Sequence, residues 1–175
     1  PFALTATCRK YRVNQKICLR QWRRILIVHT SLKEKCVSDI PEILNGYTKW
    51  GDDEPFEDHA GPFYMKMMPS TGRHLSAFIP EQRHMNGGGF LHGGMLMSFA
   101  DYALFVIASD ELRELNAVTV SCQTEFLKGV APETPVYADG EVTRNTRSLV
   151  FVRGRIFHQE ETLATFSGIL KKIVA

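Results

Sequence analysis

The sequence predicts an α+β domain in which an antiparallel sheet curls around one long, buried central helix. Two observations support this fold class. Residues 92–109 form an apolar helical run in which Asp101 is the only unambiguous charge. After that run, apolar and polar side chains alternate with the period of two that is typical of strands. The links between the strand-like runs are short, which favours antiparallel neighbours.

The central helix is expected to be buried on every side, because apolar residues occupy nearly every face of it. A transmembrane helix is the competing interpretation of 92–109. However, the run is short, and Asp101 alone would cost about 2.5–3.5 kcal/mol on insertion scales. We therefore expect no membrane span.

Strand signals lie on both sides of the helix. The runs before it are FYMKMM and RHLSAFIP, which are separated by the turn cluster PSTG. The runs after it are VTVSCQTEF (118–126), PVYADGEVT, SLVFVRGRIFH and LATFSGILKKI. The alternation in 118–126 puts Thr119 on the polar side. We expect four to six strands, a short helix in 37–47 that is capped by Ser38 or Asp39 and ends at Gly46, and a polar loop over 52–62.

Composition indicates a single domain over 37–175, preceded by a basic extension over 1–36. The chain is 44% hydrophobic and 23% charged, which is ordinary for a globular protein. The extension carries nine Lys or Arg side chains against Glu34 alone, so its net charge is +8, which leaves −6 for the rest of a chain whose total is +2. Three interpretations stay open: a non-native extension without function, a transit peptide, or a basic surface for an anionic partner.

Cysteine usage bears on the compartment. Three of the four cysteines lie in the extension, so Cys122 is the only one in the domain and no disulfide framework is expected there. That pattern fits a reducing compartment. We predict a cytoplasmic protein, or a mitochondrial-matrix protein if the extension is a transit peptide. A secretory signal is not expected, because no clean apolar core follows the charges.

The segment NGGGFLHGG (86–94) holds five glycines and matches none of the common glycine motifs. It has no Gly-Lys-Ser/Thr of a phosphate-binding loop and lacks the third glycine of a dinucleotide fingerprint. No Gly-x-Ser-x-Gly elbow occurs in the chain. The spacing of His74, His84, His92 and Cys122 does not suit zinc. We expect no metal and no cofactor.

Gly93 and Gly94 begin the helix, where free N–H groups can bind an anion and a substrate carbonyl can approach closely. An oxyanion that develops there would be stabilised. Asp101 could act as a general base or as a nucleophile. Structural roles are the alternative, with the glycines allowing close packing and Asp101 pairing with a cap or an arginine.

Gly93 and Asp101 are eight residues apart, about 12 Å along a helix. One helix therefore cannot present its N-terminus and its own Asp101 to the same carbonyl. Two antiparallel helices from two chains can do so. A catalytic pair made of these residues predicts a homodimer with two symmetric sites.

The pattern of Asn86, then His92-Gly93-Gly94, then Asp101 resembles the hotdog-fold acyl-CoA thioesterases of the phenylacetate-degradation type, within the 4-hydroxybenzoyl-CoA thioesterase superfamily. The resemblance covers roughly 60–172. It implies the hotdog fold and hydrolysis of acyl-CoA to a free acid and coenzyme A, which is part of the substrate and not a resident cofactor. It also implies a homodimer at minimum and a tetramer, as a dimer of dimers, as the expected assembly.

The resemblance also implies roles for single residues. The Gly93 N–H would polarise the thioester carbonyl, Asn86 would orient water or substrate, and Asp101 of the partner would be base or nucleophile. Thr119 would position the water. His92 would shape the helix start, with proton transfer as a lesser alternative. Predicted substrate contacts are Gly94 at the helix start, Met95, Phe99 and Tyr102 along an acyl tunnel, and Arg144, Arg147 and Ser148 near the coenzyme A phosphates. Two solvated arginines in a turn are the alternative for the last group.

Two other functions stay open. A hydratase or dehydratase of this fold would resemble Asp-x₄-His, and here no histidine follows Asp101 before His158. A non-catalytic acyl-CoA sensor attached to a DNA-binding element would use the basic extension. That extension is thin for a helix-turn-helix, so we expect no nucleic acid partner.

Overall fold

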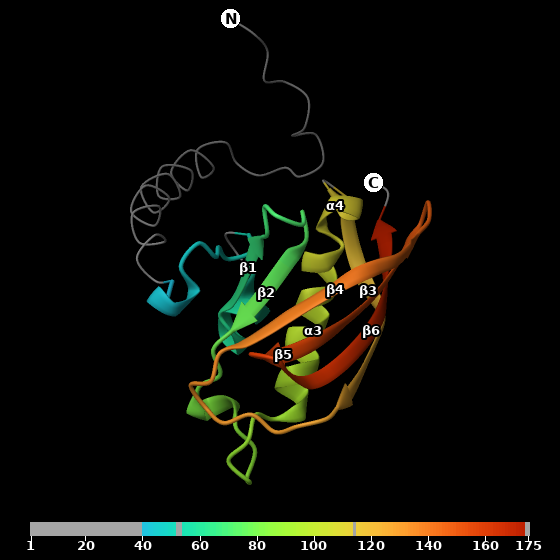
Figure 1. The fold of residues 1–175 in the computed structure, drawn as a ribbon. Coiled ribbons are helices and arrows are strands. Elements are labelled where there is room, and N and C mark those ends of the chain that lie inside the picture. The colour runs from blue at the N-terminus through green and yellow to red at the C-terminus, as the bar shows by residue number, and fades with distance from the viewer. Residues whose placement is uncertain (1–39, 52–53, 114, 174–175) are drawn as a thin grey trace, which may run out of the picture. The chain divides into compact units, whose positions relative to one another are not determined.

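The computed structural model describes residues 40–51, 54–113 and 115–173 (Figure 1). The chain divides into two compact units, 1–43 and 44–175, and the second carries the fold. The predictions for the basic extension, and for helix caps at Ser38 and Asp39, lie outside the described residues. No helix of the described part is long and apolar enough to cross a membrane. The cytoplasmic location stays a prediction.

Six antiparallel strands form one sheet in the order β1-β2-β4-β5-β6-β3. Their bounds are β1 Phe63–Met67, β2 His74–Phe78, β3 Asn116–Phe126, β4 Val136–Asn145, β5 Leu149–His158 and β6 Glu161–Ile173. The sheet curves around helix α3, Gly93–Ile107, which the short helix α4, Ser109–Leu112, follows (Figure 1). The predicted fold class is confirmed.

The start of α3 is fixed by the residue before it. The His92 backbone is extended, with φ −65° and ψ 136°, and its ring nitrogen Nδ1 accepts a hydrogen bond from the Gly94 N–H at 2.9 Å. This is an N-cap, which satisfies one of the free N–H groups of the first turn. Toward the sheet, a side chain at Gly168 of β6 would place its Cβ 2.3 Å from Leu104 Cδ1. Only glycine lets the helix approach the sheet this closely.

The expectation that α3 is buried on every side was wrong. One face of the helix is not covered by the described residues, and Met97 on it is 44% exposed. The residues of this uncovered face are Gly94, Met97, Ser98, Asp101 and Phe105. They recur at spacings of three and four and so share one side of the helix. The sheet is wide enough to cover the opposite side only.

Two predictions about the segment before β1 also need correction. The helix expected in 37–47 is a single 3₁₀ turn in the described residues, η1 Glu42–Leu44, and the positive φ of Gly46 (+82°) follows it. The expected loop at 52–62 contains helix α2, Pro55–Ala60. Proline begins a helix well because its missing N–H is not needed in the first turn. Pro55 therefore begins a helix within the expected loop.

Strand β3 lies at one edge of the sheet, where β6 is its only described partner. Its register with β6 shifts between Thr119 and Ser121, which marks a β-bulge. Such a bulge changes which side chains face inward. Thr119 and Cys122 consequently both lie on the half-buried, helix side, although simple alternation separates them, while Val120 is 58% exposed.

Candidate active site

Asp101 and Thr119 form the one direct contact among the predicted catalytic residues. Asp101 lies on the uncovered face of α3, and Thr119 lies on β3. The Thr119 hydroxyl donates a hydrogen bond to Asp101 Oδ1 at 2.7 Å, and both side chains are half-buried. A carboxylate in this position is held in one orientation while it remains within reach of solvent. This arrangement suits a group that must accept a proton.

Cys122 is a neighbour of this pair that sequence analysis did not assign to the site. Burial, and secondly the negative charge of Asp101, raise the pKa of the Cys122 thiol. A thiol with a raised pKa is a poor nucleophile at neutral pH. We therefore assign it no chemical role. Alternation alone could not have found it, because only the bulge turns Cys122 toward Asp101.

The helix start offers one free donor and not two. The N–H of Gly94 is taken by the His92 ring, whereas the N–H of Gly93 has no acceptor among the described residues. Gly93 packs beneath Phe126 at the end of β3, and a Cβ there would lie 3.3 Å from the Phe126 ring. Gly93 is therefore the backbone donor that a substrate oxygen could approach.

Asn86 supports the glycine loop through its side chain. Its Oδ1 accepts from the N–H of Gly88 at 2.8 Å and from the N–H of Phe90 at 3.2 Å. Gly89 adopts a φ of +78°, which glycine tolerates without strain. The amide NH₂ of Asn86 has no acceptor in the described part of the chain and stays available to a ligand. Its predicted role toward water or substrate stays a prediction.

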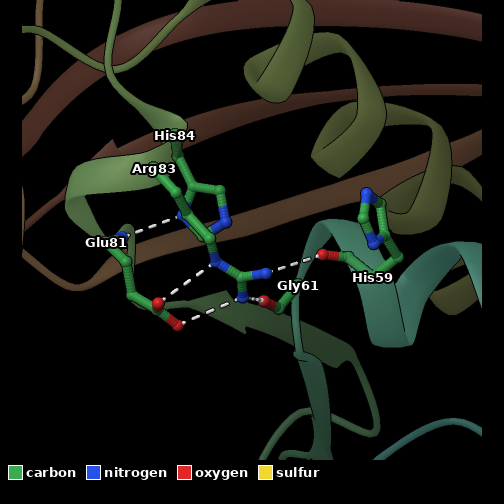
Figure 2. Close-up of polar contacts among 5 residues, drawn as sticks. All are labelled: His59, Gly61, Glu81, Arg83 and His84. Atoms are coloured by element: carbon green, nitrogen blue, oxygen red, sulfur yellow. Dashed lines mark hydrogen bonds and ion pairs between the residues drawn. The ribbon is translucent and has the colours of Figure 1, made fainter.

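A polar network missed by sequence analysis joins the elements before α3 (Figure 2). The Arg83 guanidinium donates to the carbonyl oxygens of His59 at 2.9 Å and Gly61 at 2.7 Å, and it pairs with the Glu81 carboxylate at 3.1 Å. The His84 Nδ1 accepts from the Glu81 N–H at 2.8 Å, and the His84 carbonyl accepts from the His92 N–H at 2.9 Å. The network thus connects the end of α2 with the start of α3.

His84 is buried, with 5% of its surface exposed, and its ring packs on Phe78. Burial lowers the pKa of His84, and the neighbouring Arg83 lowers it further. Because Nδ1 accepts a hydrogen bond, the neutral ring carries its proton on Nε2, which has no partner among the described residues. The environment of the His84 ring therefore favours its neutral form.

The predicted acyl-tunnel residues separate in the structure. Phe99 is fully buried in the core, and Met95 packs against that core. Tyr102 lines a cavity near the C-terminal end of α3. Contact of Met95 and Phe99 with substrate therefore stays a prediction.

Within one chain, the predicted coenzyme A contacts lie far from the helix start. Arg144 lies near the end of β4, and Arg147 and Ser148 belong to the β4–β5 turn, which Lys172 braces by donating to Asn145 Oδ1 at 2.7 Å. That turn neighbours the end of β6, which pairs with the beginning of β3, whereas Gly93 packs at the end of β3. A single chain therefore does not bring the three residues to Gly93.

Among the described residues, no group of three or more His, Cys, Asp or Glu side chains is placed to hold a metal ion.

Comparisons with known proteins agree with one another. The Thioesterase superfamily matches residues 88–165, a range that holds Gly93, Asp101 and Thr119. A Pseudomonas aeruginosa protein named as an esterase is 24% identical over 132 residues, which are 75% of this chain and 96% of that protein.

Solved structures share the fold. The E. coli PaaI protein from the phenylacetic acid degradation operon aligns with a TM-score of 0.62 at 22% identity, over 70% of this chain and 87% of PaaI. A hypothetical thioesterase protein of Streptococcus pneumoniae, determined with coenzyme A, aligns with a TM-score of 0.59 at 18% identity, over 66% of this chain and 90% of that one. With its curved antiparallel sheet around one helix, this chain has the hotdog fold, and its residues 88–165 match the Thioesterase superfamily.

Proposed function

We propose that the protein hydrolyses acyl-CoA thioesters to a carboxylic acid and coenzyme A. The observation that carries the proposal is the pairing of Asp101 with Thr119 on the uncovered face of α3, together with the unbonded N–H of Gly93. Two similar proteins support it: the Pseudomonas relative is named as an esterase, and the Streptococcus thioesterase structure was determined with coenzyme A.

The residues account for each part of the reaction. Asp101 takes a proton from a water molecule that Thr119 helps to place, and the water oxygen attacks the thioester carbonyl carbon. The Gly93 N–H stabilises the negative charge that forms on the carbonyl oxygen. The C–S bond then breaks, the coenzyme A sulfur receives the proton, and the acid is released. An attack by Asp101 itself, through an anhydride that water then cleaves, uses the same groups.

We further propose that the working unit is at least a homodimer in which α3 packs antiparallel to α3 of a second chain. Gly93 and Asp101 are separated by about 12 Å on one helix, so each site would combine Gly93 of one chain with Asp101 of the other. The uncovered face of α3 and the apolar side chains on the neighbouring edge strand favour this contact, since such a surface is rarely left to solvent. A tetramer stays a prediction.

The test is release of free thiol from short, branched, aryl and long acyl-CoAs by the native chain and by Asp101→Asn. The variant keeps the shape of the side chain and removes the base. We expect its turnover to fall by ~10²–10⁴-fold, the usual contribution of a positioned acid or base. Asp110→Asn, at an exposed position on α4, is the matched control and should match the native rate.

Two outcomes would contradict the proposal. One is the absence of turnover with every acyl-CoA, in which case saturable binding of acyl-CoA would indicate a sensing module. The other is an Asp101→Asn variant as active as the native chain.

A further inference from the structure

A cavity of about 310 Å³ lies next to the proposed catalytic pair. Tyr102 and Phe105 of α3 line it just after Asp101, and Ala117 of β3 lines it two residues before Thr119. Trp50, Glu54 and Glu57 form another of its walls. Its volume is near the lower end of the ~300–1,000 Å³ typical of ligand sites, so it suits a compact group.

One hydroxyl in this cavity is buried without a hydrogen bond. Tyr102 is 5% exposed, and its hydroxyl has no partner among the described residues. The Trp50 ring, which also lines the cavity, lies edge-on to the Tyr102 ring, with centroids 6.5 Å apart. Buried polar groups are nearly always paired, and an exception requires an explanation. A ligand that supplies the missing hydrogen-bond partner would be such an explanation.

A carboxylate faces the same space. Glu57, on α2, lines the cavity and is half-buried, and its side chain has no hydrogen bond or ion pair within the described residues. Burial raises the pKa of the Tyr102 hydroxyl, and the charge of Glu57 raises it further. Tyr102 therefore stays protonated and can donate, and the carboxylate oxygens of Glu57 can accept.

Helix α2 is anchored, so Glu57 has a defined position. Arg83 donates to the carbonyls of His59 and Gly61 at the C-terminal end of α2 (Figure 2). A cation at a helix C-terminus also interacts favourably with the helix dipole.

We propose that this cavity receives the acyl group and that Tyr102 and Glu57 are specificity-determining residues, which select acyl groups whose far end carries a hydroxyl. A hydroxyl can accept from Tyr102 and donate to Glu57 at once, which a methyl cannot do. Glu54 and Arg113, which carry opposite charges, also line the cavity. The inference rests on the proposed function, since it needs the thioester to lie at Asp101.

The test uses pairs of acyl-CoAs of equal size: 6-hydroxyhexanoyl-CoA with heptanoyl-CoA, and 8-hydroxyoctanoyl-CoA with nonanoyl-CoA. For the native chain we expect kcat/KM of the hydroxyl member to exceed that of the methyl member by at least ~10-fold in one pair, because a site built to bind a hydroxyl rejects the analogue that lacks it.

Tyr102→Phe and Glu57→Gln should each reduce that preference at least ~5-fold, which is the loss expected for one hydrogen bond. The matched controls are Tyr137→Phe, on the outer face of the sheet, and Glu160→Gln, at an exposed turn. Both should keep the native preference. Thermal unfolding of every variant shows whether a loss reflects folding.

A binding measurement separates this inference from the proposed function. Trp50 fluorescence is followed in a Trp22→Phe, Asp101→Asn chain, where hydrolysis does not interfere, during titration with each intact acyl-CoA. One outcome is that the variant chain binds the hydroxyl-bearing acyl-CoA preferentially while the native chain shows no turnover. That result would overturn the thioesterase proposal and keep the specificity site. Turnover with no preference in either assay, or a preference untouched by Tyr102→Phe and Glu57→Gln, would overturn the specificity site alone.

Discussion

The two faces of helix α3 differ in what they contribute. The face toward the sheet consists of fully buried apolar side chains, among them Phe99, Ala103 and Leu104. The uncovered face carries a half-buried carboxylate, Asp101, and a methionine, Met97, that is 44% exposed. The first face stabilises the fold of one chain. The second contributes little to that fold, and we propose that it serves a substrate and a second chain.

The largest effect on stability should come from the sheet face. Leu104→Ala removes a fully buried side chain that contacts the region of Gly168, and we expect the free energy of unfolding to fall by about 2–5 kcal/mol. Urea denaturation measures this loss. Asp101→Asn should change stability by less than about 0.5 kcal/mol, as a substitution outside the core. Equal losses of unfolding free energy in the two variants would contradict the difference between the two faces.

The helix start allows a test of a single N–H group. Proline at Gly93 removes the N–H, and the preceding His92 already has the extended backbone that proline requires. Gly93→Ala keeps the N–H and adds the same Cβ beneath Phe126. We expect Gly93→Pro to lose ~10²–10³-fold in kcat relative to Gly93→Ala, the cost of one oxyanion donor. Similar rates for the two variants would show that this N–H has no catalytic role.

The uncovered face can also be tested for chain association. Met97→Arg places a charge on that face, and we expect a monomer of native stability with little or no turnover, because each site would lack the other chain. Met67→Arg, at a methionine that is even more exposed (55%) and lies on the edge strand β1, should leave the assembly unchanged. Sedimentation velocity measures the oligomeric state of both variants. A dimeric, active Met97→Arg variant would contradict the proposed interface.

The smallest effect concerns pH. His84 has a lowered pKa in the folded chain, so below about pH 6.5 the unfolded chain takes up a proton that the folded chain resists. The contribution of His84 to stability is therefore complete above the unfolded pKa and is lost as the pH falls. We expect the decrease in unfolding free energy between pH 7.5 and 5 to be smaller in His84→Gln than in the native chain. An identical pH dependence would argue against this role.

The sequence predicted the architecture because periodicity depends on local patterns: the apolar run at 92–109 and the alternating strands both appear in the structure. It could not predict features set by contacts between distant segments. The bulge after Thr119 depends on the pairing of β3 with β6, and it brings Cys122 beside Asp101. Burial of α3 on one side only depends on how far the sheet extends.

The site, like the fold, could be predicted only in part. The pairing of Thr119 with Asp101 agrees with the expected proximity of these residues, although their roles are untested. His92 caps Gly94 and thereby leaves Gly93 as the available donor, which spacing alone could not decide. The Arg83 network could not be predicted, because its acceptors are backbone carbonyls that carry no sequence signal.

The most direct test of the shared site is to mix two inactive variants. Asp101→Asn and Gly93→Pro chains are unfolded together in equal amounts, refolded, and assayed for thiol release. If each site combines Gly93 of one chain with Asp101 of the other, half of the dimers are mixed and each of these holds one intact site, so about a quarter of the native activity should return. A mixture as inactive as the separate variants, although mixed dimers form, would contradict the shared site.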